Sequence, residues 1–343
     1  MVQQPSSSQE RPAGSELGRI ARHVIAGLAV FLVLYGLFLF VHVRFPYVQS
    51  GAALVTERKR ELARKGPLFK DPASLKIMAF GHSKMLSGMI PEQFDSELKA
   101  AGLPPVESYN FGLPGELAFL KDLEAAANRG EAPDIALLMV PWPAEDEPGP
   151  TIFKFLKHDR EIMNDLFPFR KLPRDFSIMA MEARGSPSGI RRAYLESERT
   201  INQVMLDRGY YFIERQSHYL NDELPIGFRA PTDTPEAVSV REIPAGAVFE
   251  RVVALCAKHR IRCVFVPAYY REGQFAMPPA KNERSAAFLS GYGNFDVVGP
   301  DYFVYPNRLF SDPIHVNRAG AVVYTRALAG LVAAWIREHV PQP

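Results

Sequence analysis

The longest uninterrupted apolar stretch of the chain lies near its beginning. Residues 24–41 contain no charged side chain, and a helix extended to Val43 would span about 30 Å, the thickness of a bilayer core. A secretory signal peptide, the main alternative, has a shorter apolar region that ends in small residues. This run leads instead into Arg44 and Pro46. We therefore predict an uncleaved transmembrane anchor at 23–43, in preference to a signal peptide or a buried core helix.

The segments on the two sides of the predicted anchor differ in character. Residues 1–22 are rich in Ser, Gln, Pro and Gly, which is typical of a disordered tail. Arg19 and Arg22 precede the apolar run, so the positive-inside rule favours a cytoplasmic N-terminus and an exported C-terminal domain. Residues 44–74 are expected to form a juxtamembrane stalk. Its highly charged part, 56–65, is predicted to be a solvated helix, with contact to anionic lipid head groups as the alternative.

From residue 75 onward, apolar runs of strand length alternate with amphipathic segments of helical period. This alternation predicts an α/β fold with a doubly wound, mostly parallel sheet that helices cover on both faces. The predicted strands are 75–81, 106–111, 134–140, 261–267 and 295–298. The predicted helices are 91–101, 116–128, 245–259 and 317–339.

Residues 144–241 interrupt the alternation. They are rich in charged residues, Pro and aromatics, and they show a helical pattern at 190–206 without a clear strand. We predict a largely helical insertion in a domain that spans 75–343. The insertion either shapes a substrate groove, docks a partner, or forms a structural cap without a role in recognition.

Composition excludes several classes of function. The 343 residues include 40 basic and 38 acidic side chains, a balance of +2 that lacks the basic excess of a nucleic-acid-binding protein. Cys256 and Cys263 fall on a predicted helix and the following strand, and two cysteines make neither a disulfide framework nor a zinc quartet. We interpret them as small buried apolar residues. The histidines lack the spacing of metal ligands, so we expect neither a cofactor nor a metal.

Ser83 is the first candidate for chemistry. It follows the first predicted strand in the sequence Gly81-His82-Ser83, and ligands of open α/β sheets bind at the carboxyl ends of the strands. A turn serine or a helix N-cap is the alternative reading of this position. Lys84 raises the alternative of a Ser–Lys pair, but adjacent residues on a turn point apart. The Gly-Lys-Ser/Thr ending of a phosphate-binding loop is missing.

An Asp-x-x-His sequence supplies the second candidate. Asp312 and His315 lie in a loop broken by Pro313, between the last predicted strand and the last helix. Such a loop can fold the carboxylate back onto the imidazole, which fixes the tautomer and leaves the other ring nitrogen free to accept a proton from a serine. Taken alone, Asp-x-x-His is common in turns and helix caps. A doubly wound sheet would bring this pair beside Ser83.

These blocks resemble the SGNH, or GDSL-type, hydrolase superfamily. Gly81-His82-Ser83 is similar to the nucleophile block of that family, with His82 in place of the usual Asp. Asp312-Pro-Ile-His315 is similar to the final block. The resemblance covers about 75–140 and 243–340, and it implies a flavodoxin-like three-layer domain.

The two middle blocks of the family are matched unequally. Asn110-Phe-Gly-Leu-Pro-Gly115 resembles the second block, which places Gly115 on the oxyanion glycine. The third block would supply an Asn after the third strand, but the chain has Trp142 between two prolines. Loss of one such oxyanion donor costs about 100- to 1000-fold in rate. The resemblance leaves the backbone N–H groups of Ser83 and Gly115 as oxyanion donors, with His82, Asn110 and Trp142 as candidate pocket residues.

The resemblance implies covalent acyl transfer. His315, oriented by Asp312, would deprotonate Ser83, and the acyl-serine would be resolved by a sugar hydroxyl or by water. The alternative is a catalytically degenerate SGNH-fold scaffold in a polysaccharide acylation or export complex. The missing third-block Asn favours the scaffold, whereas the intact Ser, Asp and His favour catalysis.

The overall architecture carries a second, weaker resemblance. A single anchor followed by an exported domain of this type is similar to the alginate O-acetyltransferase family and to the D-alanyl transfer protein of teichoic-acid modification. Those proteins work with multi-span membrane acyltransferases. The resemblance implies a carbohydrate acceptor, a multi-span membrane partner, and a single-pass position in a bacterial inner membrane with a periplasmic catalytic domain.

Overall fold

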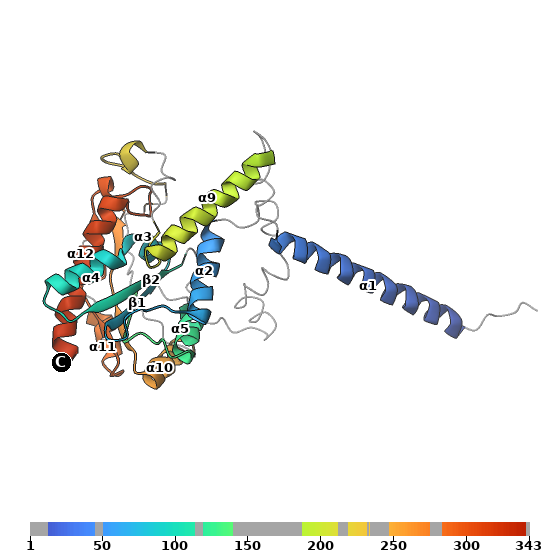
Figure 1. Ribbon diagram of the computed structural model, residues 1–343, viewed down its shortest axis with the longest axis horizontal. Helices are drawn as coiled ribbons and strands as arrows, with labels where there is room; N and C mark the ends of the chain where they lie inside the picture. The colour runs from blue at the N-terminus through green and yellow to red at the C-terminus, as the bar shows by residue number, and fades with distance from the viewer. Residues whose placement is uncertain are drawn as a thin grey trace, which may run out of the picture. The chain divides into compact units, whose positions relative to one another are not determined.

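A computed structural model describes most of the chain (Figure 1). The residues that it describes are 13–44, 51–113, 119–139, 187–211, 219–231, 233, 247–274 and 283–340. The chain divides into two units, Met1–Val48 with Gly149–Tyr194, and Gln49–Pro148 with Leu195–Pro343. The first contains the N-terminal helix and the second contains the α/β body, and each is considered by itself.

The first unit contains the long helix α1 (Ala13–Arg44). Within it, the 23-residue segment Gly18–Phe40 contains an 18-residue window with a mean hydropathy of 2.4 that is not buried. This segment is long and apolar enough to cross a bilayer, so α1 is a candidate membrane span. A signal sequence near an N-terminus would meet the same criteria. Helix α12 (Arg318–His339) meets the same criteria, but most of its apolar window is buried in the α/β body, as is typical of a core helix.

The body is built on a five-stranded sheet in which every strand pair is parallel. The strand order is β2-β1-β3-β4-β6. The strands are β1 (Leu75–Gly81), β2 (Val106–Gly112), β3 (Ile135–Leu138), β4 (Arg262–Phe265) and β6 (Phe295–Val297). They lie within, or extend by one residue, the five runs predicted from the sequence, so the α/β class with a mostly parallel sheet is confirmed.

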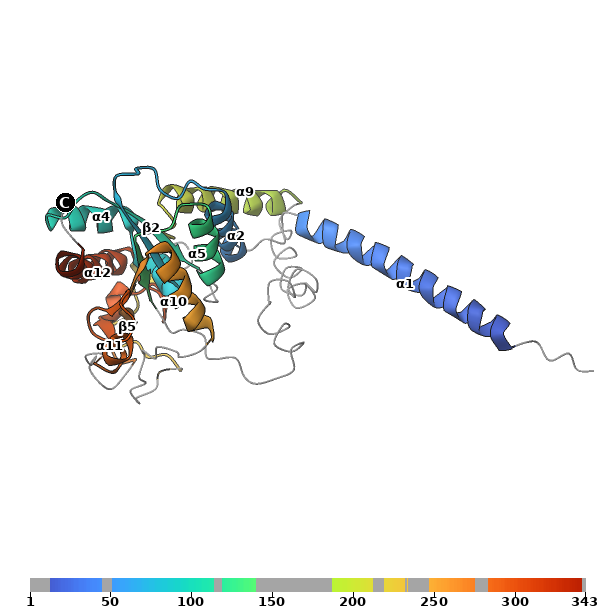
Figure 2. The same ribbon diagram turned by 90° about the horizontal axis from the view of Figure 1, so that it is seen from below.

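Helices cover both faces of this sheet (Figure 2). Alternate residues of β1 point to opposite faces, so Ile77 joins one apolar cluster and Met78 joins the other. The first cluster packs against α4 (Pro91–Ala100) and α12, and the second packs against α5 (Phe119–Asn128) and α10 (Ala247–His259). The buried thiols of Cys256 and Cys263 lie in the second cluster as free cysteines, as predicted.

Helix α2 (Gly51–Lys65) corrects the expectation of a solvated stalk. It packs against α5, and one face carries Val55, Lys59 and Ala63 at four-residue spacing, each almost fully buried. The Lys59 ammonium donates to the backbone oxygens of Asn110 at 2.8 Å and Gly112 at 2.7 Å. The sequence did not predict this buried face, because the residue at its centre is a lysine, Lys59, whose ammonium bonds to the end of β2.

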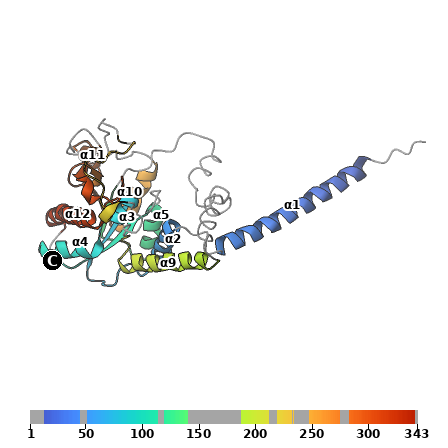
Figure 3. The ribbon, with the colours of Figure 1, turned by 90° about the horizontal axis from the view of Figure 1, so that it is seen from above.

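The insertion is described only in part. Helix α9 (Pro187–Leu206) confirms the helical pattern at 190–206. Figure 3 shows α9 beside α2, and an ion pair of 3.4 Å joins Arg58 of α2 to Glu198 of α9. A short helix, η4 (Leu220–Asp222), follows. The remaining expectations for the insertion fall outside the described residues.

Several short elements were not predicted. Helix α3 (Ser83–Gly88) begins where the sequence predicted only a turn. Strands β5 (Ala268–Arg271) and β7 (Tyr302–Tyr305) form a separate parallel pair, and helix α11 (Glu283–Leu289) precedes β6. The last connection before α12 contains the short helix η5 (Asn307–Leu309). Strand β5 and helix α3 both matter for the site, because they carry or support its residues.

Candidate active site

Ser83, His315 and Asp312 lie together at the carboxyl end of β1. His315 Nε2 is 2.8 Å from Ser83 Oγ, and His315 Nδ1 is 2.7 Å from Asp312 Oδ2. Ser83 and His315 are separated by 232 positions in the sequence. The three side chains therefore form a continuous hydrogen-bonded chain from hydroxyl to imidazole to carboxylate.

The loop that carries Asp312 and His315 is held by its own hydrogen bonds. An antiparallel bridge joins Phe310 to Val316, and Ser311 N–H donates to the His315 carbonyl at 3.0 Å. Asp312 Oδ1 accepts the backbone N–H groups of Ile314 at 2.7 Å and His315 at 2.8 Å, which is an Asx turn. With Oδ1 occupied by the turn, Oδ2 faces the imidazole.

The same bonds set the charge of the carboxylate. Burial raises the pKa of Asp312, but the hydrogen bond and charge of His315 and the two backbone N–H groups outweigh that effect and give a net lowering. A carboxylate at Nδ1 favours the tautomer with its proton on that nitrogen. Nε2 is then the acceptor for the Ser83 hydroxyl.

Two glycines allow α3 to start directly above the sheet edge. A Cβ on Gly81, at the end of β1, would lie 2.8 Å from Met85 Cβ. A Cβ on Gly112, at the end of β2, would lie 2.3 Å from the backbone nitrogen of Leu86. Only a residue without a side chain permits the second approach, because the obstructing atom is backbone. Ser83 therefore leaves the strand at once and turns its hydroxyl toward His315.

Asn110 lies in the interior, in contrast to the pocket position expected from the sequence. Its side chain is fully buried, and Nδ2 donates to the carbonyls of Met85 at 2.8 Å, Leu86 at 3.2 Å and Met89 at 2.7 Å. Its Oδ1 accepts the N–H of Gly112 at 2.9 Å. Asn110 thus connects β2 to the carboxyl-terminal part of α3 and the residue that follows it.

His82 caps the first turn of α3. Its Nδ1 accepts the backbone N–H of Lys84 at 3.2 Å, as a side chain at an N-cap does. Burial, followed by the charges of Lys84 and His315, lowers the pKa of His82 to about 4. A neutral ring whose Nδ1 is already bonded is suited to shaping the turn and is a poor second base.

Lys84 is a site neighbour whose environment the sequence did not indicate. Its side chain is only 6% exposed, and Nζ donates to the carbonyl of Tyr269 at 2.9 Å while lying 3.4 Å from the centroid of the Tyr270 ring. Burial and then the charge of Arg271 lower the pKa of Lys84 to about 7, against the opposing effect of Asp312. The ammonium bonds to β5, which does not favour a Ser–Lys pair.

The remaining predicted residues lie outside the described part of the chain. These are Gly115, the predicted oxyanion glycine, and Trp142, which replaces the third-block Asn. The N–H of Ser83 is the first of α3 and so has no acceptor within that helix. Within the described ranges, no group of three or more His, Cys, Asp or Glu side chains could hold a metal ion.

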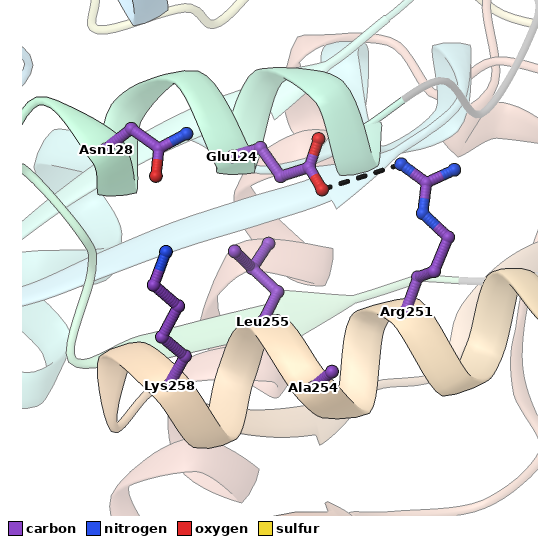
Figure 4. Close-up of a pocket in the computed structure, with 6 residues that line it drawn as sticks. All are labelled: Glu124, Asn128, Arg251, Ala254, Leu255 and Lys258. Atoms are coloured by element: carbon purple, nitrogen blue, oxygen red, sulfur yellow. Dashed lines mark ion pairs between the residues drawn. The ribbon is translucent and has the colours of Figure 1, made fainter.

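Two hollows of the described surface lie away from these residues. One, of about 270 Å³, is an open depression between α5 and α10, where Glu124 and Arg251 form an ion pair of 3.5 Å beside Leu255 and Lys258 (Figure 4). Another, of about 370 Å³, lies between β6 and the end of α12 and is lined in part by Trp335. Neither borders the Ser83 hydroxyl, so hydrogen-bond geometry rather than cavity size identifies the site.

Comparisons of the chain with protein-family profiles, with curated proteins and with solved structures found no match. The candidate site therefore stands on its residues and their geometry.

Proposed function

We propose that this protein is a serine-dependent acyl esterase or O-acyltransferase of the SGNH type. The observation that carries the proposal is the hydrogen-bonded chain from Ser83 Oγ through His315 to Asp312, with both contacts at or below 2.8 Å. A nucleophile, a base within proton-transfer reach and an orienting carboxylate are the three parts that nucleophilic catalysis by serine requires.

In the proposed reaction, Ser83 Oγ attacks the carbonyl carbon of an acyl ester while His315 Nε2 takes the hydroxyl proton. The ionised Asp312 stabilises the imidazolium that forms. The N–H of Ser83 donates to the oxyanion, together with Gly115 in the role that the sequence resemblance gives it. His315 then protonates the leaving alcohol, and the acyl-serine passes its acyl group to water or to a sugar hydroxyl.

The proposed setting is the outer face of a bacterial inner membrane, with α1 as a single-pass anchor and an exported or cell-envelope polysaccharide as the acceptor. A multi-span membrane acyltransferase is the proposed partner. Support comes from the apolar segment Gly18–Phe40 and from the resemblance of the architecture to envelope acylation proteins. The two arginines before this segment favour an exported body.

The direct test is labelling of the full-length protein, purified in detergent, with a fluorophosphonate. We expect rapid labelling of wild type and none of Ser83→Ala. The matched control is Ser74→Ala, since Ser74 precedes the same strand and its hydroxyl donates to Asp71 at 2.7 Å. Equal labelling of wild type and Ser83→Ala would refute a nucleophilic Ser83.

A second assay separates hydrolysis from transfer. Incubation with p-nitrophenyl acetate, with and without a polysaccharide acceptor, should give a Ser83-dependent acetyl adduct that is released as acetate or as acetylated sugar. A scaffold, which the replaced third-block Asn favours, would give neither the adduct nor labelling. It would instead co-purify with a membrane acyltransferase equally well as wild type or as Ser83→Ala.

A further inference from the structure

The position of His315 relative to Ser83 requires support from outside the loop that carries it. The bonds between Phe310 and Val316 fix Asp312 against His315, but none of them reaches α3. The nucleophile and the base therefore sit on two separate structural elements. The distance between Ser83 and His315 therefore depends on the parts of the protein that contact both α3 and the loop that carries His315.

Strand β5 contacts both elements. On the nucleophile side, Lys84 Nζ donates to the Tyr269 carbonyl at 2.9 Å, and the Tyr269 hydroxyl donates back to the Lys84 carbonyl at 3.0 Å. On the base side, Arg271 Nε donates to the carbonyl of Pro313 at 3.2 Å, two residues before His315. Tyr269 and Arg271 are two positions apart on one strand, so they lie on the same face, and both are almost completely buried.

Arg271 also connects the site to the insertion. Its guanidinium forms an ion pair with Asp233, donates to the Phe228 carbonyl at 3.4 Å and lies over the Phe228 ring. A planar guanidinium can hold several partners in fixed directions at once, which the single ammonium of a lysine cannot do as precisely. Arg271 thus holds the Asp312–His315 loop and the insertion segment against one strand.

We propose that β5 is a brace that sets the distance from Ser83 to His315, with Arg271 as the positioning residue on the base side and the reciprocal Lys84–Tyr269 bonds on the nucleophile side. Through Asp233, the same brace makes the reactive geometry dependent on the docking of the insertion. The kinetic part of this inference rests on the proposed function. Its structural part does not.

The chain offers a matched control for Arg271. Arg262, at the amino end of β4, also donates to a backbone carbonyl, that of His339 at 2.9 Å, pairs with Asp296 at 3.5 Å and lies over the Trp335 ring. The three kinds of contact are therefore the same in the two arginines, but the side chain of Arg262 is 33% exposed and that of Arg271 is 1% exposed. Only Arg271 contacts the loop of the candidate triad.

The kinetic test compares Arg271→Met with Arg262→Met in the full-length protein, using Ser83-dependent hydrolysis of p-nitrophenyl acetate. We expect Arg271→Met to lower kcat by about 10- to 100-fold with little change in KM, because small displacements of a catalytic group carry losses of this size. Arg262→Met should retain the wild-type kcat and KM. Arg271→Lys should recover part of the loss and serves as the test variant if Arg271→Met does not fold.

Hydrogen exchange tests the brace independently of turnover. The amides of Ser311 and His315, both held in the loop, should exchange at least about tenfold faster in Arg271→Met, or in Arg271→Lys in its place, than in Arg262→Met. Unchanged protection would overturn the brace even if the protein is an enzyme. If wild type and Ser83→Ala are equally inactive while the loop loses protection, the proposed function fails and the structural brace stands. If Arg271→Met and Arg262→Met lose kcat by the same factor, the loss reflects general destabilisation and the brace is overturned.

Discussion

Two aspartates in the body form the same local turn, yet only one of them joins a longer chain of contacts. Asp71, shortly before β1, accepts the N–H of Ala73 at 2.9 Å and the hydroxyl of Ser74 at 2.7 Å. Asp312 accepts the N–H of Ile314 at 2.7 Å in the same i to i+2 pattern, and its second oxygen faces His315. The motif is shared, so its surroundings decide what the carboxylate can do.

The amino ends and the carboxyl ends of the strands also differ in how their polar groups are buried. At the amino ends, polar groups close turns in contact with solvent, as where exposed Asp134 accepts the N–H of Lys76 at 2.8 Å. At the carboxyl ends, buried Lys84 and Arg271 tie α3, β5 and the triad loop to one another. Buried polar networks are more sensitive to the loss of a partner than exposed turns are. Matched substitutions at the two ends should therefore have unequal effects.

The largest difference in kcat is expected between substitutions of the two aspartates. Asp312→Asn keeps the size of the side chain but removes the charge that stabilises the imidazolium and fixes its tautomer, so kcat should fall by roughly 10,000-fold. Asp71→Asn should leave kcat unchanged. Steady-state hydrolysis of p-nitrophenyl acetate measures both variants. Comparable losses of kcat in the two variants would show that catalysis does not depend on where the aspartate turn lies.

A smaller difference is expected between two glycines. Gly112→Ala places a methyl group against the backbone of Leu86 and should lower the free energy of unfolding by about 1–3 kcal/mol. Gly293, before β6, has no atom within 4 Å of the corresponding position. Gly293→Ala should change stability by no more than about 0.5 kcal/mol. Urea denaturation distinguishes the two, and an equal response would contradict the close approach of α3 to β2.

A third difference should appear as a pH dependence of stability. The pKa of Lys84 is about 7 in the folded protein, whereas an unperturbed lysine titrates near 10.5. Between these values the unfolded chain holds a proton that the folded chain has released, so stability rises with pH. Wild type should gain at most about 1.4 kcal/mol per pH unit relative to Lys84→Met in this window, and nothing below it.

The control for this measurement is Lys76→Met at the amino end of β1. Lys76 is only partly buried, so its substitution tests the loss of a lysine side chain without the burial that acts on Lys84. Denaturation at pH 6, 8 and 10 suffices to compare the three proteins. A flat difference for Lys84→Met would show that its ammonium stays protonated in the folded state.

The main sheet could be predicted because its signal is local. Most of the five strands contain an apolar run beside a segment of helical period, and Pro91 and Asn317 mark helix starts that the structure confirms. Ser83, Asp312 and His315 could be found because each stands beside the end of a predicted element. Their convergence follows from the parallel topology, which brings the carboxyl ends of strands to one edge.

The supports of the site were not predictable in the same way. Strand β5 directly follows Pro267 and is only four residues long, which is too short for a periodic pattern of apolar and polar residues. It pairs with β7 outside the main sheet. The burial of Lys59, Lys84 and Arg271 could not be predicted, because a charged side chain in a sequence indicates a solvated face. Each is buried here by bonds to backbone carbonyls that only the tertiary fold provides. Asn110 is the converse case: the sequence predicts a pocket residue, but its amide is buried against carbonyls of the unpredicted helix α3 and of Met89.

The long separation of Ser83 from His315 along the chain has a consequence for biosynthesis. A growing polypeptide contains Ser83 long before it contains His315, because 232 positions separate the two residues in the sequence. Until then the hydroxyl has no proton acceptor of this kind. A product that terminates before Asp312 lacks both partners of Ser83 in this hydrogen-bonded chain, so we expect it to show no Ser83-dependent labelling by a fluorophosphonate.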